Sequence, residues 1–259
     1  MKSKNHSPAL SLFVCAAALA LPSSLQAATL TLDWNLVTWA PGQLSQSFDI
    51  DPSNPGNDVT ITVSGNTNRI SSSIIADTVI TGGVSPTNKT LKLITDFSSN
   101  LESIVVKIDF NYFDGVSGVN YLLHDIDGDG STWREEVRGI FATNGGPNFA
   151  PTDITTLNAT PTFQIAGAGL NRLLTGNVIA DDAASTGSAS VSFGSQLTHS
   201  TSFRFGASTV GSFDPIDSGI SLGAITFSNT PVPEPSSVML VLSAVTLTHL
   251  ARRREKAGR

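Results

Sequence analysis

Ile104-Val105-Val106-Lys107-Ile108-Asp109-Phe110-Asn111-Tyr112 is the segment of this chain with the clearest alternation of apolar and polar side chains. A period of two residues places the two kinds on opposite faces of an extended chain. The apolar face carries Ile104, Val106, Ile108, Phe110 and Tyr112. This pattern predicts a half-buried strand of an antiparallel sheet, with one face on a core and the other in solvent.

Shorter segments of the same character precede and follow this strand. They are residues 30–34, 59–63, 90–94, 119–126, 137–141, 162–165, 189–193, 202–205 and 220–227. Clusters of Gly, Asn, Pro and Ser separate them, and no part of residues 28–230 has the capped 3.6-residue period of a helix. Many short strands with turn-rich connections predict an all-β fold, an antiparallel β-sandwich of jelly-roll-like type that forms a single domain over residues 28–230.

Residues 1–27 have the features of a secretory signal peptide. Lys2 and Lys4 supply the positive charge, residues 9–21 supply the apolar segment, and Leu25-Gln26-Ala27 supplies the small residue before a cleavage site. The one cysteine of the chain, Cys15, lies inside the apolar segment. We therefore expect an exported protein whose mature form has no disulfide and no reactive thiol.

Residues 231–259 contain a second membrane-directed segment. Pro233 and Pro235 cannot continue a helix, the apolar residues 238–250 predict a short transmembrane helix, and Arg252-Arg253-Arg254 should stay on the cytoplasmic side. A helix over residues 236–251 would be ~24 Å long, which is shorter than the ~30 Å hydrocarbon core of a bilayer. An ordinary single-helix membrane anchor is the alternative interpretation.

The motif Val232-Pro233-Glu234-Pro235, the short apolar helix and the terminal arginine cluster together resemble the PEP-CTERM sorting signal of Gram-negative bacteria. The resemblance implies that an exosortase, a membrane-embedded transpeptidase-like enzyme, recognises Pro233, Glu234 and Pro235 and removes the tail. It also implies a transient membrane anchor and a destination at the cell envelope, the cell surface or the extracellular polysaccharide matrix of a biofilm. The resemblance covers about a tenth of the chain and carries no information on the activity of residues 28–230.

The charge of the chain limits its partners. The whole chain has a formal net charge of −6, but residues 28–230 alone hold 8 Lys and Arg against 19 Asp and Glu, which is a net charge of −11. Phosphate binding needs a basic surface, so we expect no nucleic-acid partner. An acidic exported domain that takes up divalent cations fits this composition better.

The segment Asp125-Ile126-Asp127-Gly128-Asp129-Gly130-Ser131-Thr132-Trp133-Arg134-Glu135-Glu136 matches the calcium-loop spacing D-x-D-x-D-G-x5-E. Side-chain oxygens of Asp125, Asp127 and Asp129, the carbonyl of Ser131 and both carboxylate oxygens of Glu136 would supply the ligands. The flanking segments are predicted as strands, so the motif indicates a structural Ca²⁺ loop between two strands and disfavours an EF-hand. A solvated acidic hairpin turn is the alternative.

A second acidic segment contains Asp49, Asp51, Asn54 and Asp58. These residues could form another cation loop. Pro52 and Pro55 lie between them, however, and favour a rigid turn as the simpler interpretation.

Enzyme motifs are scarce in residues 28–230. His124 and His199 each stand alone, and neither belongs to a zinc-binding or nucleophile-elbow pattern. We therefore expect a non-enzymatic surface or matrix component. A calcium-stabilised, lectin-like carbohydrate-binding module is the first alternative, with Trp133 as the sugar contact, since Trp34 and Trp39 are expected in the core. A polysaccharide-active hydrolase that uses two carboxylates is a more distant alternative.

Overall fold

The structure is a computed structural model in which residues 28–76, 88–180, 185–208 and 218–229 are described. Residues Ala27–Thr230 form one compact unit. The predicted signal peptide (residues 1–27) and the predicted sorting signal with its hydrophobic helix (residues 231–259) lie outside the described residues. Among the described residues, no helix is both long enough and apolar enough to cross a membrane.

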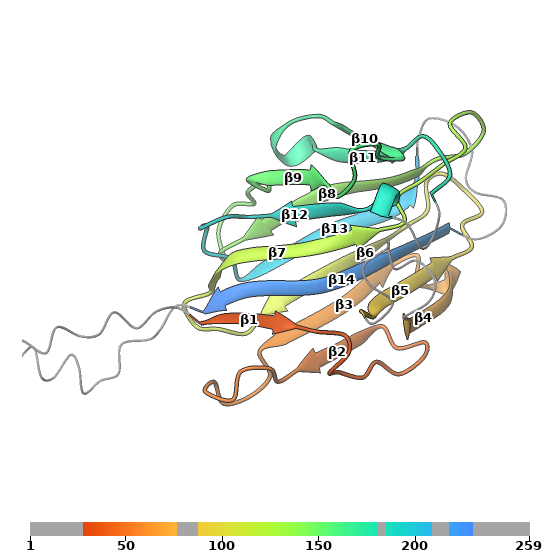
Figure 1. Ribbon diagram of the computed structural model, residues 1–259. Helices are drawn as coiled ribbons and strands as arrows, with labels where there is room; N and C mark the ends of the chain where they lie inside the picture. The colour runs from red at the N-terminus through yellow and green to blue at the C-terminus, as the bar shows by residue number, and fades with distance from the viewer. Residues whose placement is uncertain (1–27, 77–87, 181–184, 209–217, 230–259) are drawn as a thin grey trace, which may run out of the picture. The chain divides into compact units, whose positions relative to one another are not determined.

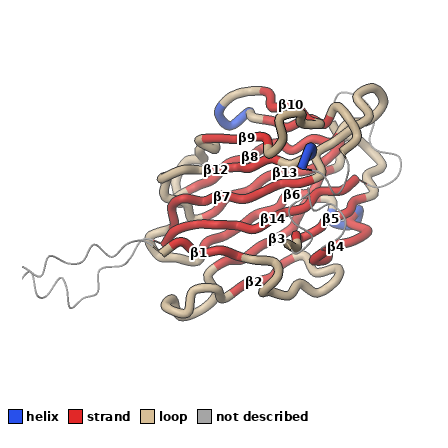
Figure 2. The backbone as a smooth tube through the Cα atoms, viewed as in Figure 1, coloured by secondary structure: helices blue, strands red, loops and turns tan. Residues whose placement is uncertain are grey.

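The described residues form two antiparallel sheets, which confirms the predicted all-β sandwich (Figure 1). Sheet A contains, in spatial order, β4 (Ile70–Ala76), β5 (Thr90–Thr95), β14 (Ser218–Asn229), β7 (Val116–His124), β12 (Ala189–Ser192) and β9 (Asp153–Thr156), with β1 (Thr29–Leu32) paired to β14. Sheet B contains β10 (Phe163–Ala166), β11 (Leu173–Gly176), β8 (Glu135–Thr143), β13 (Ser200–Ala207), β6 (Ser103–Phe110), β3 (Val59–Gly65) and β2 (Ser45–Phe48). Helical residues within these ranges are confined to short 3-10 turns in the connections (Figure 2).

The most regularly alternating segment of the sequence becomes β6, a central strand of sheet B. Ile104, Val106 and Ile108 are fully buried, whereas Lys107 on the opposite face is exposed. Opposite sheet B, Phe227 of β14 packs against Phe110 of β6 with ring centroids 4.9 Å apart. Each such side chain contributes ~1.5–3 kcal/mol on full burial, so the core between the sheets is the main source of stability.

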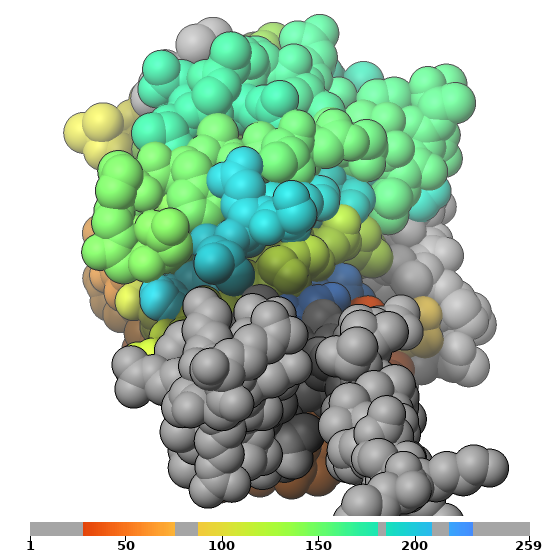
Figure 3. Space-filling view, turned by 90° about the vertical axis from the view of Figure 1, so that its left-hand side faces the viewer, coloured from red at the N-terminus to blue at the C-terminus, as the bar shows by residue number. Residues whose placement is uncertain are grey.

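Strand β14, in the last described segment of the chain, pairs with β1, in the first described segment. Thr29 of β1 lies opposite Ser228 of β14, and Leu32 lies opposite Ile225. In Figure 1, β1 (red) accordingly runs beside β14 (blue). Figure 3 shows the unit from the side that lies at the left of Figure 1. There the cyan segment between β12 and β13 lies against green and yellow-green segments of lower residue number. Thr198, which precedes β13, forms an isolated bridge with Val116, the first residue of β7.

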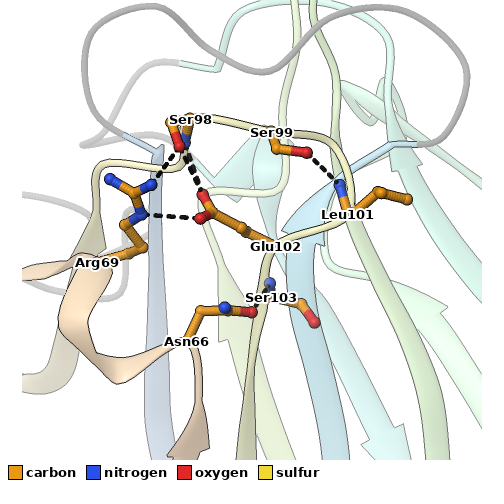
Figure 4. A network of polar contacts seen from close by, with 7 residues as sticks. All are labelled: Asn66, Arg69, Ser98, Ser99, Leu101, Glu102 and Ser103. Atoms are coloured by element: carbon orange, nitrogen blue, oxygen red, sulfur yellow. Dashed lines mark hydrogen bonds and ion pairs between the residues drawn. The ribbon is translucent and has the colours of Figure 1, made fainter.

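The 3-10 turn η1 (Thr67–Arg69) connects β3 of sheet B to β4 of sheet A. A network of polar contacts stabilises this connection (Figure 4). Arg69 Nε lies 2.9 Å from Glu102 Oε1, and the Ser98 amide donates to Glu102 Oε2 at 2.7 Å. Asn66 Oδ1 accepts the Ser103 amide at 3.0 Å. The backbone hydrogen bond from Ser98, followed by the contact with Arg69, lowers the pKa of Glu102. The network thus ties η1 to the start of β6.

Candidate functional site

The candidate calcium segment is the connection between β7 and β8. Its flanks are strands, as the sequence predicts, and an isolated bridge between Gly128 and Arg134 narrows it. Asp125, which follows β7 directly, has a φ of 68°, in the left-handed region that Asp tolerates better than most residues. The connection is therefore a tight, twisted turn at the end of the sandwich.

Asp129 holds the tip of this turn together. Its Oδ1 accepts backbone N–H groups from Ser131 at 2.8 Å, Thr132 at 2.6 Å and Trp133 at 3.0 Å, and its Oδ2 accepts the Thr132 hydroxyl. The side-chain hydrogen bond from Thr132 and the backbone bonds hold the pKa of Asp129 well below its usual range. Both oxygens of this carboxylate are therefore engaged within its own turn.

Asp127 and Glu135 lie deeper, where the turn meets both sheets. Asp127 Oδ2 accepts the Ala180 amide at 2.8 Å. Glu135 is 2 % exposed, and its Oε1 accepts the Gly219 amide of β14 at 3.0 Å, so its side chain bridges from β8 of sheet B to sheet A. Burial, and then the charges of Asp127 and Asp125, raise the pKa of Glu135 well above its usual value. A neutral Glu135 therefore suits this position.

Glu136 points the other way. Adjacent residues of a strand face opposite sides of the sheet, and Glu136 forms an ion pair with Arg138 at 2.7 Å on the outer face of sheet B. Ser131 is exposed at the loop tip. The five predicted ligands are thus not gathered around one point, and among the described residues no group of three or more His, Cys, Asp or Glu side chains is placed to hold a metal ion. Calcium binding by this segment stays a prediction.

The calcium spacing gives no role to Glu135. The alternation of side chains along the strand could have indicated that Glu135 is buried. Glu135 lies two residues before the buried Val137, so both side chains should face the interior. The calcium spacing selected its neighbour Glu136 instead.

His124 ends β7 and is fully buried. Its Nδ1 lies 2.8 Å from the hydroxyl of Ser188, whereas its Nε2 has no hydrogen-bond partner among the described residues. Desolvation lowers the pKa of His124 to about 4. A fully buried imidazole of this kind has no access to a dissolved substrate.

The tryptophans separate as expected. Trp34 and Trp39 are 1 % and 5 % exposed, and their indole N–H groups donate to the Gly223 carbonyl at 2.9 Å and the Ser73 hydroxyl at 2.8 Å. Trp133 is partly exposed in the turn between β7 and β8. It is the tryptophan that has surface available for a sugar ring.

The second acidic segment forms a hydrogen-bonded turn between β2 and β3. Asp58 Oδ2 accepts the amides of Ile50 at 2.7 Å and Asp51 at 2.6 Å, and its Oδ1 accepts the Asn54 side chain at 2.6 Å. Asp51 Oδ1 accepts the amide and the hydroxyl of Ser53 at 3.0 and 2.6 Å. This geometry agrees with the rigid-turn interpretation, since the carboxylates are occupied by groups of the turn itself.

The sorting residues Pro233, Glu234, Pro235, Arg252, Arg253 and Arg254 lie outside the described residues. No protein-family model matches the chain, and no curated protein matches it significantly.

Proposed function

We propose that this chain is an exported, non-enzymatic β-sandwich protein that is sorted through a C-terminal PEP-CTERM signal to the surface or extracellular matrix of a Gram-negative bacterium. The proposal depends chiefly on one observation: the order Pro233-Glu234-Pro235, apolar helix and Arg252-Arg253-Arg254 behind a secretory signal peptide. An exosortase is the partner that this order requires. Within the sandwich class, we propose a jelly-roll-like topology.

The position of β14 supports the proposal. Asn229 ends β14, and three residues separate it from Pro233. The sorting motif therefore follows the last described strand in sequence after a short connection, and removal of the tail would leave every described strand intact.

The state of the ionisable groups supports a non-enzymatic role. The described groups with strongly shifted pKa values include His124 and Glu135, and both side chains are buried among hydrogen-bonding partners from the fold. Catalytic groups with shifted pKa values are expected in a cleft that substrate can enter. Desolvation inside the core is the cause of the shift at His124 and the larger cause at Glu135, where the charges of Asp127 and Asp125 add to it, and neither shift requires a catalytic role.

Mass spectrometry of the chain produced in an exosortase-bearing host tests the proposal. We expect a product that begins near Ala28 and lacks the arginine cluster. The substitution Glu234→Ala should leave the tail attached, while Glu255→Ala, a control beyond the helix, should not change processing. A full-length product in the cytosol with both ends intact would exclude the proposal.

A carbohydrate-binding module is the second candidate, and the partial exposure of Trp133 favours it. In this candidate, calcium bound near Asp125 and Asp127 would fix the turn that presents Trp133, and would relieve the repulsion between these carboxylates and Glu135. Glycan binding that is lost in Trp133→Ala but kept in Trp34→Phe would favour it. Hydrolysis of a matrix polymer that stops on carboxylate substitution would instead favour a hydrolase.

A further inference from the structure

The outer face of sheet B has a depression at the centre of the sheet. The register of β8 and β13 shifts between Ser202 and Arg204, and Gly139 opposite this shift has a φ of 59°. An inserted residue of this kind bends the strand and interrupts the hydrogen-bond ladder locally. The depression has a volume of about 280 Å³ and is lined mainly by Val105, Arg138, Gly139, Phe141, Ser202 and Arg204.

The charges around the depression are unusual for so acidic a protein. Arg138 and Arg204 are direct cross-strand partners, and Lys107 on the next strand lies opposite Ser202. Three of the eight cationic residues within residues 28–230 thus occupy neighbouring strands on one face. Glu136 and Asp109 pair with two of these three cations, so the group keeps one uncompensated positive charge.

Arg204 is the unmatched member of this group. Arg138 is paired with Glu136 at 2.7 Å, and Lys107 is paired with Asp109 at 2.7 Å. Within the described part of the chain, the exposed guanidinium of Arg204 has neither an ion-pair nor a hydrogen-bond partner. Its planar set of N–H donors matches the two oxygens of a carboxylate.

Apolar groups and a hydroxyl lie beside this guanidinium. Phe141 and Val105 are partly exposed on the strands that flank β13, and Ser202 lies two residues before Arg204 on the same face. Aromatic faces pack on the C–H faces of sugar rings, while hydroxyl groups pair with sugar hydroxyls. The volume is at the low end for small-molecule sites, which suits a single sugar residue.

We propose that this depression binds a uronic-acid residue of a carboxylated polysaccharide, with its carboxylate on Arg204 and its ring against Phe141. The proposal rests on the proposed function only for the source of the polymer, which would be the extracellular matrix. Residues 28–230 carry a net charge of −11, so the domain as a whole does not attract an anionic polymer, and binding would depend on the direct contact with Arg204.

Calorimetric titration with a trimer of galacturonic acid tests the site, with the full chain in mild detergent and, in parallel, with residues 28–230. A salt concentration of ~0.15 M limits long-range repulsion to a Debye length of ~8 Å but leaves a direct ion pair largely intact. We expect binding by the native chain and at least tenfold weaker binding by Arg204→Ala. Arg204→Lys should bind with intermediate strength, because an ammonium keeps the charge but loses the two-pronged geometry.

Two controls separate this site from general attraction. Lys89→Ala removes an exposed cation just before β5 of sheet A and should bind like the native chain. The methyl-esterified trimer keeps the sugar shape without the charge and should not bind. Equal binding by Arg204→Ala, equal binding of the methyl ester, or no binding of the trimer at millimolar concentration overturns the proposal. These results are independent of tail processing, so either proposal can fail without the other.

Discussion

The side-chain amide of Asn229 donates a hydrogen bond to Asp51 Oδ2 at 2.8 Å, and thereby joins the last residue of β14 to the turn between β2 and β3. The Tyr112 hydroxyl reaches the same carboxylate oxygen at 3.4 Å. Asp51 is 5 % exposed, so these bonds compensate a carboxylate that has lost most of its water. Two sequence-distant segments, one from each sheet, are thus held together at one end of the sandwich.

We expect Asn229→Ala to lower the free energy of unfolding by about 1–3 kcal/mol, because the buried Asp51 oxygen loses a donor. Urea unfolding of the native and variant chains measures the difference. Asn88→Ala, which changes an exposed asparagine, should have almost no effect. Desolvation opposes ionisation of Asp51, but hydrogen bonds from Ser53 and Asn229 outweigh it and lower its pKa. The stabilisation is therefore present above the ordinary pKa of 3.8 and is lost as pH falls through the lower folded-state value.

His124 should destabilise the fold in a different pH range. Its pKa is about 4 in the folded protein and 6.5 ordinarily, so the unfolded chain binds the additional proton between these values. The destabilisation caused by His124 is absent above pH 6.5. It increases as pH drops towards 4 and lowers the free energy of unfolding by on the order of 3 kcal/mol. An NMR titration of the imidazole protons of residues 28–230, which contain two of the four histidines of the chain, measures the folded pKa, and His199→Gln assigns the signals. A folded-state pKa near 6.5 for His124 would contradict the buried, desolvated position.

Glu135 acts in the opposite direction. Burial beside Asp127 and Asp125 raises its pKa, so the folded protein retains a proton that the unfolded chain releases above its ordinary pKa of 4.5. Stability should decline as pH rises from about 4.5 towards the raised folded-state value. Glu135→Gln keeps an acceptor for the Gly219 amide and cannot ionise. We expect the variant to be more stable than the native chain at pH 8, by about 1–3 kcal/mol, with little difference at pH 4. Thermal melts at both pH values measure this, and an unchanged difference would contradict the argument.

Alternation predicted the central strands well because both of their edges are paired and one face is buried. Strands β3, β5, β6 and β12 lie within two residues of their predicted limits. The sequence did not predict β2, β4, β9 or β11. Of these, β2, β4 and β9 are at sheet edges and are rich in Ser, Thr or Asp, whereas β11 is an interior strand of only 4 residues. An edge strand has one pairing partner and more solvent, so its sequence needs less apolar alternation.

The acidic turn was located correctly, but its side-chain arrangement could not be obtained from spacing. A calcium spacing presumes that alternate carboxylates turn inward around one centre. Here the backbone of the turn supplies donors to Asp129, and the strand register sends Glu136 to the outer face, where Arg138 pairs with it. These competing partners come from backbone geometry and from cross-strand packing, which a local motif does not encode.

Calcium uptake by this turn is directly measurable. If the spacing motif reports a true site, millimolar Ca²⁺ should raise the melting temperature, since a ligand at 100 times its dissociation constant adds ~2.7 kcal/mol to stability. Asp127→Asn should abolish the shift, whereas Asp153→Asn on the exposed edge strand β9 should retain it. Identical melts in calcium and in chelator would contradict calcium uptake by this turn.

The packing of the turn against β11 rests on Gly176. A Cβ atom at this position would lie 1.6 Å from the carbonyl oxygen of Asp127, a backbone atom that cannot rotate away. We expect Gly176→Ala to lower the free energy of unfolding by about 3 kcal/mol or more, because the turn must move or β11 must separate from it. At Gly146, the nearest atom to an added Cβ is Asn144 Oδ1, 3.4 Å away, so Gly146→Ala should change stability by less than about 0.5 kcal/mol. Urea unfolding compares the two variants. Equal stability of the two variants would mean that Asp127 does not lie against β11 as closely as the structure places it.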